Sequence, residues 1–268
     1  MIKNGAASLM VRLLHLPRAA SAPTYPRRRH HLALLPSLRL RVPAPAAAAA
    51  MSSAAAAQEV ADQKRALRSE VRRALRALTP EQRASEDQAI QNAILNSSWF
   101  KESKRLCAYI SCAQLREVDT SKVLSEVLSP NSEHGHAKDL YVPRVEDKNR
   151  NMRMLKITTM DDLVKNSMNI LEPSPLDASG NAREEGQAFD RTGRRLGRGG
   201  GYYDTFLMRY QELAKEKGWY QPLLVALSYS VQILEEGIIP VNSTDVPIDA
   251  LVSSSGIIPI SPAALARI

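Results

Sequence analysis

The sequence predicts one α/β domain of three layers, in which helices flank a mostly parallel central sheet in a Rossmann-like arrangement. Three observations support this fold class. Helical segments alternate with short, continuously apolar segments, which is typical of parallel strands buried on both faces. No internal repeat is visible. The chain has 268 residues, of which 44% are apolar, and this is enough for one sizeable core.

The first predicted helix spans residues 59–78. Its apolar side chains recur at steps of three and four residues, as in an amphipathic helix: Leu67, Val71, Leu75 and Leu78. A second helix follows at once, because Thr79 suits an N-cap, Pro80 suits the first helical position and Gln82 completes a capping box. We expect this helix to reach about Trp99.

The rest of the chain alternates strands with helices. A further helix is expected from Thr120, and another follows Gly201 and ends at Gly218, a residue type that commonly stops helices. The strand candidates are the apolar stretches 105–111, 139–145, 152–157 and 222–228. Residues 174–188 are rich in Pro, Gly, Asp and Glu and have no apolar run, so no strand is expected there.

The positive charge is concentrated at the N-terminus. The whole chain has a formal net charge of +8, with 36 Lys and Arg against 28 Asp and Glu. Residues 1–58 contain 8 basic residues and no acidic one, so residues 59–268 are formally neutral. An Arg-, Ala- and Ser-rich segment without acids is typical of an organellar transit peptide. We therefore expect a disordered transit peptide at 1–58 and the folded domain at 59–268, with a disordered basic tail as the alternative for the leader.

The leader also indicates the location of the protein. We expect the mitochondrion, with the chloroplast as the alternative, whereas a product started at Met51 would lack the leader and stay cytosolic. The apolar stretch 9–16 is interrupted by Arg12 and His15, so it does not suit a secretory signal, and no run reaches the roughly 18 residues of a membrane helix. Because the remainder is neutral and only 5% of residues are aromatic, neither a nucleic acid nor a membrane is expected as a partner.

Histidine is scarce in the folded part. Beyond the leader the chain has only His134 and His136, in a Ser-, Asn- and Gly-containing loop. A catalytic triad would have to use that loop, so we favour chemistry carried by Asp, Glu, Arg, Lys, Tyr, backbone groups and a metal ion. Cys107 and Cys112 are too few for a zinc site and suit buried positions.

The glycine-rich segment 191–204 carries the strongest chemical signal. Five glycines and three arginines fall within residues 193–201, directly before a helix. Glycines let backbone N–H groups approach an anion, the helix N-terminus adds a positive dipole end, and arginines match phosphate geometry. The segment therefore predicts a polyphosphate cradle, with a flexible basic loop as the alternative. Asp204 follows the cradle, where a Mg²⁺ ion between its carboxylate and the phosphates would offset their repulsion.

The same segment closely resembles the signature of the 5-formyltetrahydrofolate cyclo-ligase (5,10-methenyltetrahydrofolate synthetase) family. The matching residues are Arg195-Leu196-Gly197-Arg198-Gly199-Gly200-Gly201-Tyr202-Tyr203-Asp204. Other stretches fit by their order over roughly residues 62–260, namely 64–68, 109–111, 117–120, 141–144, 152–154, 170–173 and 241–249. Together with the leader, residues 215–219 suggest a member of the plant organellar type.

The resemblance implies a reaction. Such enzymes use ATP and Mg²⁺ to convert 5-formyltetrahydrofolate to 5,10-methenyltetrahydrofolate, and they release ADP and phosphate. Phosphorylation of the formyl oxygen would turn a poor leaving group into phosphate, which a neighbouring folate nitrogen then displaces. This chemistry needs positioning and charge neutralisation rather than a histidine. We expect a monomer that accepts the folate with or without a polyglutamate tail.

The resemblance also assigns roles to residues. The ATP-binding residues would be Lys64, Arg65, Ala66, Leu67, Arg68, Arg195, Leu196, Gly197, Arg198, Gly199, Gly200, Gly201, Tyr202 and Tyr203. The substrate-binding residues would be Ile110, Glu117, Arg198, Gly199, Gly200, Gly201 and Tyr202. The catalytic residues would be Arg198 and Tyr202, and the Mg²⁺ ligands Asp204 and Asp245.

Plainer structural roles stand beside these assignments. Lys64 and Arg68 could lie on an ordinary solvated helix face, and Asp245 could cap a loop. Ile110 could be part of the core, and core packing is as good an interpretation for one of the two tyrosines, Tyr202 or Tyr203.

One departure from the family is serious. Relatives usually carry a buried apolar strand immediately before the pair Phe189-Asp190, whereas residues 184–188 read Glu-Glu-Gly-Gln-Ala here. We therefore expect one central strand to be missing, with poor solubility or reduced turnover compared with a form in which the strand is restored. An isoform that binds folate and ATP without turnover is the alternative to an active ligase, and a nucleic-acid-binding protein is the third hypothesis.

Overall fold

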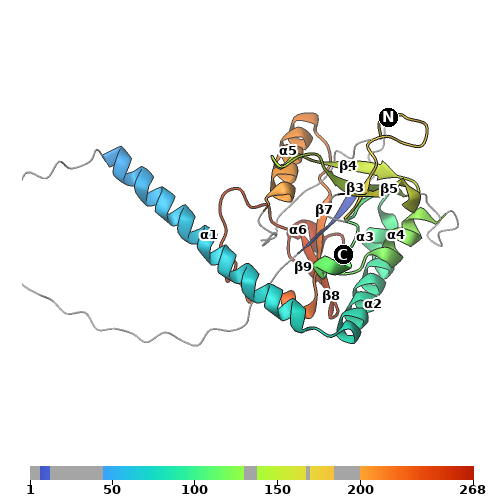
Figure 1. Ribbon diagram of the computed structural model, residues 1–268, viewed down its shortest axis with the longest axis horizontal. Helices are drawn as coiled ribbons and strands as arrows, with labels where there is room; N and C mark the ends of the chain where they lie inside the picture. Colours follow the sequence, from blue (N-terminus) through green and yellow to red (C-terminus); the bar gives the residue numbers. More distant parts are fainter. Residues whose placement is uncertain (1–6, 13–44, 130–137, 167–169, 184–199) are drawn as a thin grey trace, which may run out of the picture.

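The computed structural model describes residues 7–12, 45–129, 138–166, 170–183 and 200–268 (Figure 1). Within these ranges the chain forms a layered α/β domain from which one long helix projects. The predicted class, with helices flanking a mostly parallel sheet, is confirmed.

Seven strands of the described ranges form the central sheet, in the order β4-β3-β2-β1-β7-β8-β9. They are β1 (Ala7–Arg12), β2 (Arg105–Cys107), β3 (Asp139–Val145), β4 (Met152–Ile157), β7 (Leu223–Leu227), β8 (Ala250–Ser253) and β9 (Gly256–Pro259). The four inner pairings are parallel, whereas the edge strands β4 and β9 run antiparallel to their neighbours. A separate small sheet pairs β5 (Leu163–Lys165) with β6 (Leu171–Pro173).

One face of the central sheet is covered by helices that share a hydrophobic cluster with it. These helices are α1 (Pro45–Ala77), α2 (Pro80–Asn96), α3 (Ser98–Glu102), α4 (Ser121–Leu128) and α6 (Pro262–Leu265). Their buried side chains include Val71, Ile90, Phe100 and Leu124, which belong to the same cluster as Leu106 of β2. The buried side chains of these helices therefore form one hydrophobic cluster with this face of the sheet.

The opposite face is covered by α5 (Tyr202–Lys217). Its buried residues Leu207, Tyr210 and Ala214 belong to a second cluster with Leu224 and Ala226 of β7. The other residues of β7 belong to the first cluster, and all five of its residues are buried. A strand that is buried on both faces lies in the middle of a sheet rather than at its edge.

Several helix ends lie where the local sequence predicts them. The Thr79 hydroxyl accepts the N–H of Gln82 at 3.2 Å and completes the predicted capping box of α2. Helix α5 begins after Gly201 and ends at Gly218, and both glycines adopt the left-handed conformation. The bounds of β3 and β4 coincide with the predicted strands 139–145 and 152–157.

Two other predicted bounds are wrong. The second helix stops at Asn96 rather than near Trp99, because the extended backbone of Ser97 separates it from the short helix α3. The strand predicted at 105–111 pairs only over Arg105–Cys107, after which the chain turns toward the 3₁₀ helix η1 (Ala113–Leu115).

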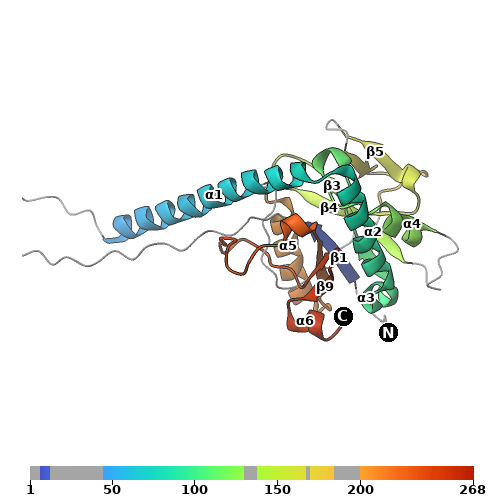
Figure 2. The same cartoon turned by 90° about the horizontal axis from the view of Figure 1, so that it is seen from below.

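Two segments of the predicted leader have a described backbone. Residues Ala7–Arg12 form β1, which pairs with β2 on one side and β7 on the other. Helix α1 begins at Pro45 instead of residue 59, and its first half extends away from the layers (Figures 1 and 2). Residues 1–6 and 13–44 lie outside the described part, so the transit-peptide assignment stays a prediction there.

Candidate functional site

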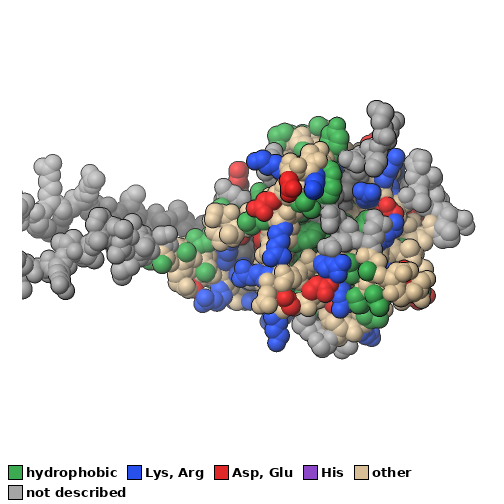
Figure 3. Space-filling view, turned by 90° about the horizontal axis from the view of Figure 1, so that it is seen from above, with side chains coloured by type: hydrophobic (Ala, Val, Ile, Leu, Met, Phe, Trp, Pro, Cys, Tyr) green, Lys and Arg blue, Asp and Glu red, His purple; other side chains and the backbone are tan. Residues whose placement is uncertain are grey.

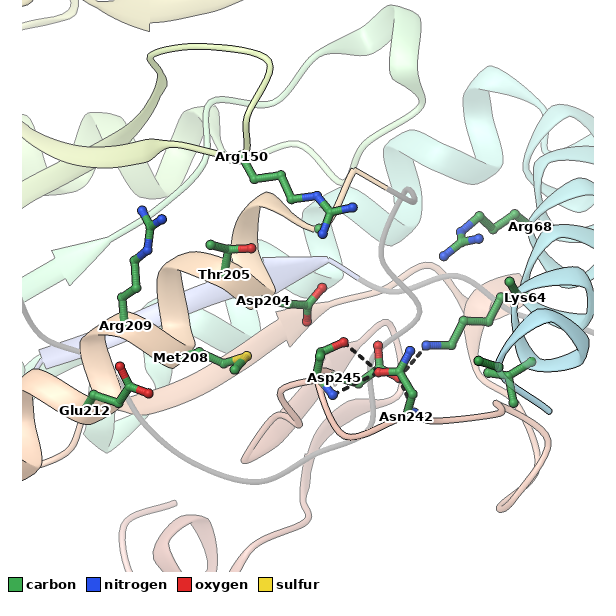
Figure 4. A pocket seen from close by; sticks show the side chains of 15 residues that line it. Lys64, Arg68, Arg150, Asp204, Thr205, Met208, Arg209, Glu212, Asn242 and Asp245 are labelled. Carbon is green, nitrogen blue, oxygen red and sulfur yellow. Dashed lines mark hydrogen bonds and ion pairs between the residues drawn. The ribbon is translucent and has the colours of Figure 1, made fainter. Parts of the chain in front are cut away.

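A pocket of about 580 Å³ opens between α1, the N-terminal part of α5 and the loop that precedes β8 (Figure 4). This volume is in the range of small-molecule sites. Its charged lining residues are Lys64, Arg68, Arg150, Arg209, Asp204, Glu212 and Asp245. Four basic and three acidic side chains together suit an anion of high charge that is accompanied by a cation.

Lys64 and Asp245 form an ion pair in one wall of the pocket. Their side chains are only 8% and 13% exposed, so water screens this pair weakly. The same carboxylate oxygen accepts the backbone N–H of Asn242 at 2.8 Å. Asp245 therefore caps its loop, as the plainer interpretation expected, and also fixes the lysine of α1 in the pocket.

The N-terminus of α5 forms the facing wall. Gly201 precedes the helix with φ +70°, and Asp204 lies in the first turn, where a carboxylate interacts favourably with the helix dipole. The Asp204 Oδ1 atom accepts the N–H of Val246 at 3.3 Å. Because Val246 directly follows Asp245, this bond holds the two predicted metal ligands on adjoining walls of one pocket.

Arg150 is a pocket residue that sequence reasoning missed. It lies between β3 and β4 with φ +66°, a conformation that is uncommon outside glycine. A Cβ atom on Gly201 would lie 3.4 Å from the Arg150 side chain, so the two residues are close neighbours, and the φ of +70° is what favours glycine at position 201. Figure 4 shows that the guanidinium groups of Arg150 and Arg68 reach toward the pocket from opposite sides. The polar loop of residues 147–151 signals a turn, but it carries no local sign of this long-range contact.

The pocket residues fit the binding of a metal ion together with a nucleotide. Mg²⁺ commonly uses one or two protein carboxylates and takes its other ligands from water and phosphates. Asp204 and Asp245 supply two carboxylates here. Within the described ranges, no group of three or more His, Cys, Asp or Glu side chains could hold a metal ion. The residues therefore suit an ion that the substrate phosphates help to coordinate.

Three predicted ATP-binding residues of α1 do not line the pocket. Arg65 forms an ion pair with Asp62 at 2.8 Å on the exposed side of the helix. Ala66 is exposed, and Leu67 belongs to the core. Of this group of five consecutive residues, the structure brings Lys64 and Arg68 into the pocket, and the role of the other three stays a prediction.

The residues that open α5 lie beside the pocket. The Tyr202 hydroxyl donates to the carbonyl oxygen of Asp147 at 3.1 Å, and a Cβ atom on Gly200 would lie 2.9 Å from the Tyr202 ring. Both Tyr202 and Tyr203 are partly buried against the second hydrophobic cluster. Core packing, which was the alternative interpretation for one of them, therefore applies to both, and their contact with a ligand stays a prediction.

The predicted folate turn lies in the loop after β2. The Glu117 carboxylate accepts the N–H of Cys112 at 2.7 Å, and Ile110 packs against the first cluster. The Tyr229 hydroxyl lies 2.9 Å from the Glu117 carbonyl oxygen and 2.8 Å from Asp87 Oδ1. Burial raises the pKa of Asp87 and also the pKa of Tyr229. This network fixes the turn, but Ile110 and Glu117 do not line the described pocket.

The centre of the glycine signature lies outside the described residues. It comprises Arg195, Leu196, Gly197, Arg198 and Gly199. Their predicted roles in phosphate binding, and the catalytic role of Arg198, therefore stay predictions.

Comparison with known proteins identifies the family. The family model described as the 5-formyltetrahydrofolate cyclo-ligase family matches residues 60–254, which is most of the chain. The chain belongs to this family. The enzyme class predicted from the sequence, a cyclo-ligase, is thereby confirmed at the level of the family.

Two individual cyclo-ligases support this result, and one solved structure matches the fold. The chain is 61% identical over 216 positions to the Arabidopsis thaliana mitochondrial 5-formyltetrahydrofolate cyclo-ligase, covering 75% of this chain and 78% of the relative. It is 30% identical to the mouse cyclo-ligase, covering 72% of this chain and 95% of the relative. An NMR structure of Aquifex aeolicus 5,10-methenyltetrahydrofolate synthetase matches the fold with a TM-score of 0.54 at 23% identity, covering 75% and 92% of the two chains.

The match to the Arabidopsis cyclo-ligase also shows a gap. The aligned stretch has 216 positions, whereas 75% of 268 residues is about 201, so about 15 positions have no counterpart in this chain. This agrees with the predicted loss of a segment. Of the stretch 174–188, residues 174–183 are described and form a turn with one isolated bridge rather than a strand.

The surface of this cyclo-ligase mixes both signs of charge on the face that Figure 3 shows. Lys and Arg side chains lie among Asp and Glu side chains there, beside hydrophobic patches. Among the helices of the described ranges, none combines the length and the apolar character that crossing a membrane requires.

Proposed function

We propose that this chain catalyses the ATP- and Mg²⁺-dependent conversion of 5-formyltetrahydrofolate to 5,10-methenyltetrahydrofolate. Family membership supports the folate and the ring closure. The charged pocket supports the nucleotide, and this is the observation that carries the proposal. Lys64 and Arg68 from α1 and Arg150 from the β3–β4 loop face the N-terminus of α5 across the pocket, which suits a polyphosphate.

The bond changes balance with ATP alone as co-substrate. The formyl oxygen attacks the γ-phosphorus atom and ADP leaves, so the oxygen becomes part of a phosphate ester. The second folate nitrogen then attacks the formyl carbon, loses its proton and displaces phosphate. No covalent bond to the protein is needed, so the pocket acts by positioning and by charge stabilisation.

The described residues divide this work. Lys64, fixed by Asp245, would contact phosphate oxygens of the nucleotide. Arg150 and Arg68 would offset further phosphate charge from opposite sides. When bound, Mg²⁺ would supply charge neutralisation of the phosphates near Asp204 and Asp245. The predicted folate turn around Glu117 would hold the pterin.

The proposal extends to location and assembly. The acid-free leader and the mitochondrial relative both favour mitochondrial targeting. A monomer is proposed, and the substrate is the folate with or without a polyglutamate tail.

The direct test uses the purified full-length chain with 5-formyltetrahydrofolate, ATP and Mg²⁺. We expect the absorbance of 5,10-methenyltetrahydrofolate to rise, and we expect no rise when ATP is omitted or Mg²⁺ is chelated. Calorimetric binding of ATP and folate to a folded chain that gives no absorbance change would contradict turnover and select the binding isoform instead. A folded chain that binds neither compound would overturn both hypotheses.

A further inference from the structure

The central strand of the sheet comes from a distant part of the chain. Strand β1 is formed by Ala7–Arg12, whereas its neighbours β2 and β7 begin at Arg105 and Leu223. Its register joins three residues to β2 and five to β7, all in parallel. The leader therefore contributes the strand that connects the two halves of the sheet.

The position between β2 and β7 requires an occupant. All five residues of β7 are buried, and so are Leu106 and Cys107 of β2. Backbone N–H and C=O groups that are buried away from water need hydrogen-bond partners. Without β1, the facing groups of β2 and β7 would border a slot inside the sheet, between the two hydrophobic clusters.

Among the described residues of the part that matches the family model, 60–254, no other strand could take the place of β1. Between β6 and α5, residues 174–183 form a turn stabilised by Asp177, whose Oδ1 atom accepts the N–H groups of Ser179 and Asn181 at 2.9 Å each. About 15 positions of the Arabidopsis relative have no counterpart in this chain, as shown above. Two independent observations thus agree: the chain is short of one segment, and a foreign segment occupies the middle of its sheet.

We propose that the slot between β2 and β7 is a strand-binding site, and that residues 7–12 of the same molecule are its ligand. The site accepts an extended segment in parallel orientation through backbone hydrogen bonds, as in strand addition. Occupation within one molecule is feasible, because the 32 residues 13–44 can span up to about 3.3 Å each. The leader is then part of the folded domain as well as an address.

This role conflicts with removal of the leader. A product that starts at Met51, or one cleaved beyond Arg12, lacks β1 and leaves the slot open. Import with cleavage and completion of the sheet therefore compete for the same residues. The folded form of this chain is the one that retains its N-terminus.

The register supplies a direct chemical test. Leu9 pairs with Cys107 of β2, and neighbouring strands bring paired Cα atoms within the range that a disulfide spans. We would refold the full-length Leu9→Cys variant under mild oxidant, with Cys112→Ser in the background. The matched control is Met10→Cys, one residue along the strand, where the register offers no cysteine.

We expect mass spectrometry after digestion to find an intrachain disulfide between positions 9 and 107 in Leu9→Cys. We expect no such disulfide in Met10→Cys. A disulfide between two molecules would overturn the proposal in its intramolecular form, because a second copy would then fill the slot. If a folded Leu9→Cys chain forms neither the intrachain nor the intermolecular disulfide, the pairing of β1 with β2 is wrong.

Amide hydrogen exchange provides a second measurement that needs no cysteine. Proline has no N–H group and is excluded from central strands, so Leu9→Pro with Val11→Pro should release β1. We expect amide exchange over Leu223–Leu227 to become at least tenfold faster, or the soluble fraction to be lost. The control double variant Ala19→Pro with Ser21→Pro has the same spacing outside β1 and should leave exchange unchanged. Unchanged exchange in the first variant would overturn the proposal.

Truncation tests the slot as a binding site. The chain 51–268 should be insoluble or should exchange its β7 amides at least tenfold faster than the full chain. Refolding it with a synthetic peptide of residues 5–14 should restore protection at one peptide per chain, whereas a scrambled peptide should not. Full solubility and protection of 51–268 without peptide, or equal rescue by the scrambled peptide, would refute the strand-binding site.

Discussion

Replacement of Lys64 by Met separates the structural role of the Lys64–Asp245 ion pair from its role toward ATP. The change removes a charge and retains most of the apolar stem. Because the two side chains are only 8% and 13% exposed, it leaves a largely buried carboxylate without its partner. Loss of one partner of a buried pair typically costs about 3–5 kcal/mol. The single variants Lys64→Met and Asp245→Asn should each lose stability on this scale.

The double variant gives the decisive comparison. Lys64→Met combined with Asp245→Asn removes both charges, so the free energy of unfolding should recover by at least about 1 kcal/mol relative to the sum of the single losses. Affinity for ATP should not recover. A hydrogen bond to a charged group contributes about 1.5–3 kcal/mol, so the KM for ATP should rise about 10- to 150-fold in Lys64→Met and in the double variant.

Urea unfolding and steady-state kinetics measure the two effects in the same proteins. The KM for the folate should change little, because the pair faces the nucleotide pocket. The matched control is Arg72→Met, which removes an exposed basic side chain from the same helix and should change neither quantity. If the double variant regains both stability and the wild-type KM for ATP, Lys64 acts only in folding and the nucleotide assignment of the pocket is wrong.

Three further comparisons test other parts of the account. Gly201→Ala and Gly218→Ala each place a side chain at positive φ at an end of α5, so each should lower the free energy of unfolding in urea by about 1–2 kcal/mol. Only Gly201→Ala, which lies beside Arg150, should also raise the KM for ATP. Equal KM values for ATP in the two variants would contradict the assignment of the pocket to the nucleotide. Arg150→Ala should raise the KM for ATP about tenfold, whereas Arg153→Ala on the adjoining strand should leave it unchanged, as Michaelis plots would show. Burial opposes ionisation of Asp162, but hydrogen bonds from two backbone N–H groups and an arginine lower its pKa to about 2. After allowance for screening by water, Asp162→Asn should cost about 1 kcal/mol of stability near pH 7. The stability gained from a lowered pKa is complete above the ordinary value of 3.8 and is lost as pH falls toward the folded value. This difference should therefore vanish as pH falls from about 4 to 2, and a constant difference in urea titrations would argue against the mechanism.

Patterns of neighbouring residues correctly predicted the helix ends and the strand that depend on local sequence. The capping box of Thr79 and Gln82 and the glycines around α5 fix backbone ends through neighbouring residues, and the structure places these ends as predicted. Burial on both faces also identified β7 from its apolar run. The end of the second helix was missed because Ser97 adopts an extended backbone inside a helical pattern.

The site and the central strand depend on contacts that no local pattern records. The pairing of Lys64 with Asp245 joins residues 181 positions apart, so resemblance to a family suggested both residues but the residue types alone did not. Arg150 enters the pocket through the fold of a hairpin. The apolar stretch 9–16 was visible, but nothing in it indicates that β2 and β7 leave a place between them.

Transfer of an oxygen label tests the central chemical claim most directly. The full-length chain would turn over 5-formyltetrahydrofolate labelled with ¹⁸O in the formyl group, in the presence of ATP and Mg²⁺, and the released phosphate would be analysed by mass spectrometry. Attack of the formyl oxygen on the γ-phosphorus predicts one ¹⁸O atom in each phosphate and one methenyl product per ATP consumed. Unlabelled phosphate, or methenyl product formed without ATP consumption, would contradict the account.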